Sequence, residues 1–463
     1  MIIVGLHVIF LILYVAFSSV FPAEVMSVLL IAHCIISILR DIANKMKLYV
    51  MTAFYIGVII TTLANLLYII KISSGGLSEY SMYKYIVEAH INEATVLWCI
   101  GNCCIFIGYK LFEKSKLPTV SFDLSKEKTL KHLFTFIVVF SILNLTGNMI
   151  NLSFITGGIQ KVLSLLNVMG ILFYARLWVY EDNKKYRNYA LVLAVMQTVI
   201  ALYTSFLRIE LLTPAISFFG GYFIGKGSIK YLFSARVVPA LLVVVIFSLF
   251  FKTLAGNRSH FISAFTNNGV DPYNSSYTDL SEAVDKGEGG AFERSANIAQ
   301  LTNVVALVKK NGFYGGAVSY PLIAAFVPRI FWPDKPTIQL GSWFALEIGA
   351  ATIGESGRAN NSVNMSVPGE LYLDFGWIGV VIGCILFGGM VAIFWNASEF
   401  NESPYNLSGA LWGGYLLLYA LLGIGSDLQI VVSLLSTYIV FLIVKKIANR
   451  DEGTSHRAAL ERQ

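Results

Sequence analysis

The chain has 463 residues, of which 56% are hydrophobic and only 13% are charged, and its mean hydropathy is +0.67. A soluble domain carries about 25% charged residues, so this composition excludes a water-soluble globule and predicts a polytopic membrane protein. The net charge of +6 does not indicate a nucleic-acid partner, because the Lys and Arg enrichment of cytoplasmic loops accounts for such an excess.

Apolar segments recur along the chain, and a helix needs about 20 mostly apolar residues to cross a bilayer. We therefore predict an all-α polytopic integral membrane protein with about twelve transmembrane helices. The first segment lacks a basic n-region and a small-residue cleavage site, so we expect a retained helix there. The predicted spans are 2–20, 24–40, 48–70, 92–110, 131–150, 162–180, 188–206, 210–225, 237–254, 376–396, 406–424 and 428–445.

The basic residues give these spans an orientation. With the N-terminus in the cytoplasm, the cytoplasmic connections hold more than half of the 34 Lys and Arg residues. The short connections on the opposite side hold few, as the positive-inside rule requires. The cytoplasmic connections are 40–47, 110–131, 181–187, 226–236, 397–405 and the tail.

This topology divides the chain into four parts. Residues 1–254 form helices one to nine, 255–375 form one large periplasmic loop, 376–447 form helices ten to twelve, and 448–463 form a cytoplasmic tail. The loop has eight basic and eleven acidic residues, so it is not a basic surface that attracts anions through its overall field. An anion site there needs individually placed cations.

The large loop is not uniform. Residues 265–290 are rich in Asn, Asp, Ser and Gly and are typical of a flexible cover. Residues 292–310 have helical periodicity, and 340–351 predict another short helix. The apolar run 314–332 predicts a helix that lies in the interface or re-enters it. The apolar face predicted within 292–310 consists of Ile298, Leu301, Val305 and Val308.

The residues that ligate metals are not grouped. All five cysteines lie in apolar runs, where a thiol is a small hydrophobic group, and no two of the six histidines have ligand spacing. We therefore expect no metal site and no cofactor.

Cations near the expected outer face are the best candidates for chemistry. An arginine at a membrane boundary is costly unless it is paired or faces a wet cavity. A guanidinium also makes paired hydrogen bonds to phosphate. Simpler roles stay open, because Arg208 can pair with Glu210 and the others can anchor the loop to headgroups. The candidates are Arg208, Arg258, Arg294, Arg329, Lys335 and Arg358.

Two residues are candidates for a general base. Glu370 precedes the predicted span 376–396 at the outer surface, where partial burial suits a carboxylate to accept a proton. A charge that favours the helix N-terminus is the simpler alternative. His260 competes as the base, since histidine titrates near neutral pH, although a solvated loop histidine explains it equally well.

Two motifs carry a family resemblance. They are Val-Pro-Arg-Ile-Phe-Trp-Pro-Asp-Lys-Pro at 327–336 and Gly-Glu-Leu-Tyr-Leu-Asp-Phe-Gly-Trp-Ile-Gly at 369–379. With the topology, they resemble bacterial O-antigen and oligosaccharide repeat-unit polymerases of the Wzy type.

The resemblance implies a GT-C-like glycosyltransferase of the bacterial inner membrane, with its active site facing the periplasm. Its substrates would be undecaprenyl-diphosphate-linked oligosaccharides. A hydroxyl of the incoming unit would displace undecaprenyl diphosphate from the growing chain. The six cations and Tyr372 would contact diphosphate and sugar, and Glu370 or His260 would be the base. A chain-length regulator in the membrane is a possible partner.

Two other functions fit the topology. An O-antigen ligase shares it, but the 327–336 motif favours the polymerase. A lipid-linked oligosaccharide flippase would place charges and broken helices in mid-membrane, whereas the spans here are poor in central charge.

Overall fold

A computed structural model describes residues 2–43, 50–73, 84–115, 117–119, 127–149, 153–204, 208–226, 297–320, 340–349, 362–400 and 402–421, with isolated residues between and after them. Every regular element in these ranges is a helix. The helices are α1 (Ile2–Ala16), α2 (Ala23–Ala43), α3 (Val50–Ser73), α4 (Lys84–Phe112), α5 (Glu127–Met149), α6 (Ser153–Glu181), α7 (Lys184–Thr204), α8 (Arg208–Gly225), α13 (Ile298–Asn311), α15 (Leu340–Glu347), α16 (Val367–Ser398) and α17 (Leu407–Leu421).

Helices coincide with ten of the twelve predicted spans, from α1 to α8 and at α16 and α17. The span 237–254 lies outside the described residues, and only isolated positions of 428–445 lie within them. Four described helices are long and apolar enough to cross a membrane: Ala23–Asp41, Val50–Ser73, Ala89–Phe112 and Val367–Ser398. These features are consistent with a polytopic membrane protein, and the count of twelve stays a prediction.

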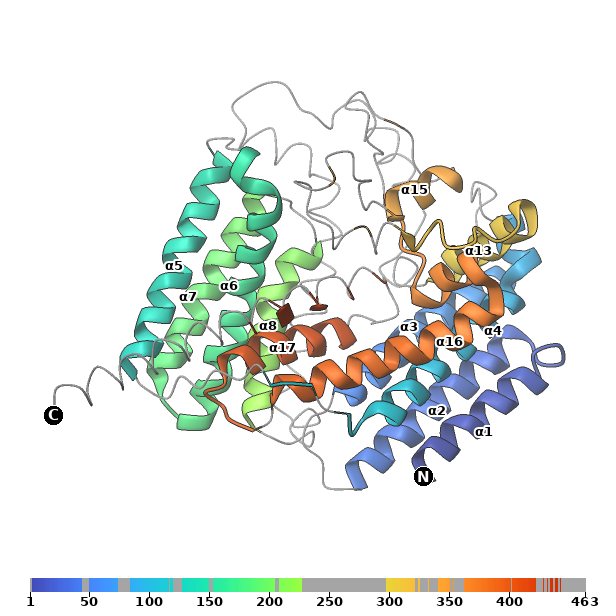
Figure 1. Cartoon of the computed structure of the whole chain (residues 1–463), viewed down its shortest axis with the longest axis horizontal. Helices are drawn as coiled ribbons and strands as arrows, with labels where there is room; N and C mark the ends of the chain where they lie inside the picture. Colours follow the sequence, from blue (N-terminus) through green and yellow to red (C-terminus); the bar gives the residue numbers. More distant parts are fainter. Residues whose placement is uncertain are drawn as a thin grey trace.

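The helices form two groups joined by α17. Helices α1 to α4 pack with α13 and α16, and α5 to α8 pack with one another. Helix α17 lies between the groups and contacts α3, α6 and α16 (Figure 1). The closest pairing is that of α4 with α16. It depends on glycine, because a Cβ at Gly108 would lie 1.9 Å from the Ile385 carbonyl oxygen.

Large apolar side chains cover the outside of several helices. Ile378, Ile382 and Leu386 are 73%, 56% and 60% exposed and stand four residues apart, on one face of α16. Continuous apolar surface of this kind is not stable in water, so we assign these faces to lipid.

Helix α16 reverses direction at Gly376. That residue has φ 61° and ψ −149°, a backbone conformation that is essentially restricted to glycine. Residues 367–375, the short arm, therefore fold back along residues 377–398, the long arm. Leu371 shows the reversal, because its side chain lies 2.6 Å from the Cβ position of Gly383. The long arm alone is roughly 33 Å long, enough to cross a hydrocarbon core of about 30 Å.

Polar contacts bring three of the predicted cytoplasmic connections to one end of the helices. Asn396, the residue before the connection 397–405, donates to the Glu113 carbonyl oxygen of 110–131 at 2.8 Å. Lys185 donates to Glu127 at 2.5 Å, which joins 181–187 to 110–131. This hydrogen bond lowers the pKa of Glu127 and raises the pKa of Lys185. The contacts place these three connections together, and the orientation of the spans stays a prediction.

Buried polar side chains also occur within the first group. His7 and His33 lie 2.7 Å apart between Nδ1 and Nε2, and both are buried. Tyr55 and Tyr14 lie 3.3 Å from the remaining ring nitrogens of His7 and His33, respectively. All five cysteines, Cys34, Cys99, Cys103, Cys104 and Cys384, are buried free thiols.

Candidate functional site around the short arm of α16

The structure describes three of the predicted site residues. Glu370 and Tyr372 lie on the short arm, and the backbone of Arg208 opens α8. The described part of the chain includes no group of histidine, cysteine and carboxylate side chains that could hold a metal. The predicted residues outside the described ranges are His260, Arg258, Arg294, Arg329, Lys335 and Arg358, together with the cover at 265–290.

The short arm is fixed by Asp374, which is 1% exposed. Its carboxylate accepts four hydrogen bonds from the segment just after α13, and this shapes residues 315–319 into turns. The predicted helix 314–332 is therefore wrong over 315–319, where Gly315 and Gly316 also have positive φ. The donors are the N–H groups of Gly316 (3.1 Å), Val318 (3.0 Å) and Ser319 (2.8 Å), and the Ser319 hydroxyl (2.5 Å).

Helix α13 also packs against the short arm. Its predicted apolar face is confirmed, since Ile298, Leu301, Val305 and Val308 are all buried. Gly369 allows close approach, because a Cβ there would lie 3.1 Å from Leu301. The start of α13 is held by Asn65 of α3, whose side chain donates to Asn297 and accepts from the Ile298 N–H. The predicted short helix at 340–351 is confirmed as α15.

Glu370 lies inside the helix bundle. The sequence predicted partial burial of this residue near the outer surface, and the structure shows a carboxylate that is only 2% exposed. The reason is the reversal at Gly376, which turns the start of α16 inward. Its neighbour Pro368 lies 2.4 Å from the Cβ position of Gly101, in the middle of α4. The Glu370 carboxylate accepts the Leu428 N–H at 3.2 Å. A buried carboxylate among spanning helices is costly, which marks it as a functional candidate.

Tyr372 connects the short arm to charged residues on two other helices. Its hydroxyl donates to Glu93 Oε1 of α4 at 3.0 Å. Lys309 of α13 pairs with Glu93 Oε2 at 2.5 Å, and the same ammonium lies 3.3 Å from His90 Nδ1. We call these four residues the Glu93 cluster. The Tyr372 ring is 4% exposed, with edge-on contacts to Phe313 and Trp377, so contact with sugar stays a prediction.

The Glu93 cluster was not predicted, because its members are spread from residue 90 to residue 372. One signal was available. Glu93 stands near the start of a predicted span, and an isolated carboxylate there needs a partner. The structure supplies Lys309, one of two lysines in the last turn of α13.

Comparisons with known proteins add a partial similarity. The chain is 27% identical over 124 residues to the O-antigen polymerases of Salmonella typhimurium and Salmonella typhi. The matched stretch covers 26% of this chain and 30% of each relative, so it spans less than a third of their length. No family profile matches the chain, and no solved structure matches it.

Proposed function

We propose that this protein is a repeat-unit polymerase of a surface polysaccharide, such as O-antigen. The partial similarity to two O-antigen polymerases supports a role in O-antigen synthesis. The observation that carries the proposal is Glu370, a buried carboxylate on a helical arm that folds back among membrane helices. In this proposal, Glu370 is the group that accepts the proton when the lipid-linked substrate reacts.

The proposed reaction joins two undecaprenyl-diphosphate-linked glycans. A hydroxyl oxygen of the incoming repeat unit attacks the anomeric carbon of the growing chain. The bond from that carbon to the diphosphate oxygen breaks, and undecaprenyl diphosphate leaves with the electron pair. The hydroxyl proton passes to the carboxylate of Glu370, while the cations of the large loop stabilise the leaving diphosphate. His260 is the alternative base.

Asp374 has a different role from Glu370. Its oxygens already accept four hydrogen bonds from residues 316–319, so it positions the short arm and does not accept the substrate proton. The Glu93 cluster also positions the short arm, because the Tyr372 hydroxyl donates to Glu93 of α4. We therefore assign proton transfer to Glu370 and the positioning of the arm to Asp374 and the Glu93 cluster.

The test is gene deletion followed by complementation, with the surface glycan resolved on a gel. Loss of a polymerase leaves lipid A-core that carries a single repeat unit. Loss of a ligase leaves bare core with long glycan on undecaprenyl lipid, and loss of a flippase leaves neither product outside. Wild-type complementation is expected to restore the ladder.

Glu370→Gln is expected to fail in this assay, because removal of a general base slows transfer by roughly 10²–10⁴-fold. Its membrane level and melting temperature should stay normal, since Gln retains the size of the side chain. Glu402→Gln, at an exposed glutamate near α17, is the matched control and should restore the ladder. Arg258→Ala and Arg329→Ala test in the same assay whether these two cations contribute to transfer. A normal ladder from Glu370→Gln would exclude that residue as the base.

A further inference from the structure

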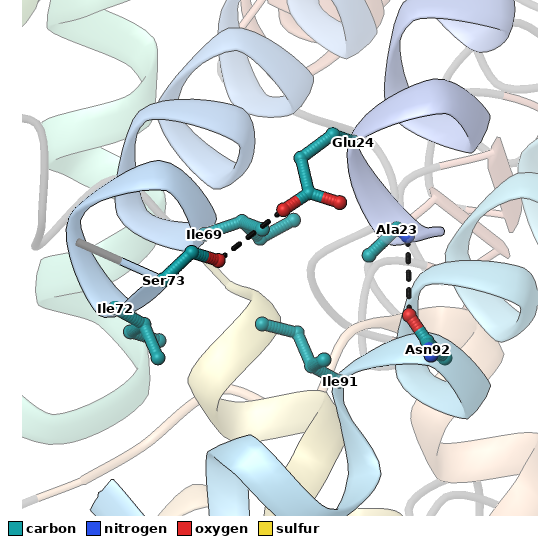
Figure 2. Close-up of a pocket in the computed structure, with 7 residues that line it drawn as sticks. All are labelled: Ala23, Glu24, Ile69, Ile72, Ser73, Ile91 and Asn92. Atoms are coloured by element: carbon teal, nitrogen blue, oxygen red, sulfur yellow. Dashed lines mark hydrogen bonds between the residues drawn. The ribbon is translucent and has the colours of Figure 1, made fainter. Parts of the chain in front are cut away.

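A cavity of about 370 Å³ opens where α2 begins, α3 ends and α4 has made its first turns. Its volume is within the range of small-molecule sites, roughly 300–1,000 Å³. Figure 2 shows the side chains of all three helices around it. The lining residues are Ala23, Glu24, Ile69, Ile72, Ser73, Ile91 and Asn92.

The polar groups of this cavity are only partly used by the protein. Ser73 Oγ donates to Glu24 Oε1 at 3.3 Å, and the Ala23 N–H donates to Asn92 Oδ1 at 3.1 Å (Figure 2). Within the described ranges, Glu24 Oε2 and Asn92 Nδ2 have no hydrogen-bond partner. The cavity therefore offers a charged acceptor and a neutral donor above three isoleucine side chains.

This chemistry limits the ligand. The carboxylate of Glu24 repels phosphate, so the cavity does not suit the diphosphate of a lipid carrier. Sugar hydroxyls donate to a carboxylate and accept from an amide, and the C–H face of a sugar ring packs on apolar side chains. Binding of neutral sugar requires this combination of a few placed polar groups on an apolar wall.

The position of the cavity relates it to the short arm. Asn92 of the cavity is next to Glu93 in α4, and Glu93 accepts the Tyr372 hydroxyl. The start of α13, held by Asn65, also adjoins α3 on this side of the bundle. A glycan bound in the cavity would thus lie beside the helix turn that holds the short arm.

We propose that Glu24, Ser73 and Asn92 form a saccharide subsite, which holds sugar residues of the lipid-linked glycan away from the reacting bond. The identity of the glycan rests on the proposed function, whereas binding of sugar to the cavity does not. The subsite would retain a chain between successive additions.

The experiment uses the full-length protein in lipid nanodiscs and a free oligosaccharide, released from the cell's own surface glycan and labelled at its reducing end. Because the probe carries no lipid and no diphosphate, its binding reports the saccharide subsite alone. Glu24→Gln and Asn92→Ala are each expected to weaken binding by roughly tenfold, the effect of one lost hydrogen bond to a charged or fixed partner. Ser18→Ala, at the end of α1, should bind as wild type does.

Further arms separate the possible outcomes. Glu370→Gln should bind the probe normally while it fails to extend glycan in cells, so failure of the subsite and failure of the proposed function can be told apart. Equal binding by wild type, Glu24→Gln and Asn92→Ala would overturn the subsite. So would loss of probe binding when phosphatidylethanolamine is added to phosphatidylglycerol nanodiscs, because a lipid amine would then be the occupant of the cavity.

Discussion

Compared with the long arm of α16, which exposes Ile378, Ile382 and Leu386 to lipid, the short arm is buried at eight of its nine residues. The long arm makes few polar side-chain contacts before Asn396. The short arm places Glu370, Tyr372 and Asp374 in hydrogen bonds with three separate parts of the chain. The long arm therefore anchors the helix in the membrane, and the short arm carries its chemistry. One glycine separates the two.

The largest loss of stability is expected from Asp374→Asn. The amide cannot accept the four hydrogen bonds that the carboxylate accepts, and buried N–H groups would lose their partners. We expect a loss of at least about 3 kcal/mol of unfolding free energy. The measurement is the fraction of monodisperse protein after heating in detergent. Asp182→Asn, at an exposed aspartate between α6 and α7, is the control and should melt as wild type does.

Gly376→Ala is expected to cost about 1–3 kcal/mol, the usual strain of a side chain in a conformation restricted to glycine. The added Cβ would also lie 2.7 Å from the Phe313 ring. Gly220→Ala in α8 is the matched control, since nothing lies within 4 Å of its Cβ position. Equal melting temperatures for the two variants would mean that α16 does not reverse at Gly376.

Tyr372→Phe is expected to cost about 1 kcal/mol, the value of a single hydrogen bond. Glu93→Gln and the double variant complete a thermodynamic cycle that isolates the contact between the two side chains. The coupling should be clearly non-zero if Glu93 fixes the arm. Additive effects would instead show that the arm is held by Asp374 alone. Tyr180→Phe, at an exposed tyrosine, should change nothing.

The smallest effect is expected from Lys185→Met, which removes the exposed partner of Glu127 at the far end of the bundle. The lowered pKa of Glu127 gives stability that is present above its ordinary value and is lost as the pH falls through the lowered one. The raised pKa of Lys185 gives stability that is present below its ordinary value and is lost as the pH rises through the raised one.

Melting curves of wild type and Lys185→Met should therefore differ slightly at neutral pH and converge as the pH falls below the lowered pKa of Glu127. A difference that persists in acid would show that the lysine acts through packing. A large difference at neutral pH would contradict the contrast between the buried arm and the exposed connections.

The sequence predicts those parts of the fold that depend on local pattern. Hydropathy located the helices of ten spans, and periodicity identified the buried face of α13 from Ile298 to Val308. The expected start of a span at 376 coincides with the reversal at Gly376. In these cases, the residues that decide the structure are neighbours in the sequence.

Contacts between residues far apart in the sequence determine the parts of the fold that local pattern does not predict. Residues 315–319 look like part of an apolar helix until Asp374, more than 50 residues later, binds their N–H groups. The nearly complete burial of Glu370 depends on the fold-back of the short arm, whose close contacts with α4 and the long arm need glycine at 101, 379 and 383. Hydropathy averages over such positions and does not detect close backbone packing.

The five buried cysteines have a practical consequence for mapping sidedness. A thiol that is shielded from water does not react with membrane-impermeant maleimides, so the natural chain provides an unlabelled background without any cysteine being removed. A single cysteine placed at Asn311, the last residue of α13, should be labelled from the periplasm in intact spheroplasts. One placed at Glu402, before α17, should be labelled only after the membrane is opened. The access of the maleimide to these two positions would thus show directly on which side of the membrane α13, and the short arm of α16 that packs against it, are found.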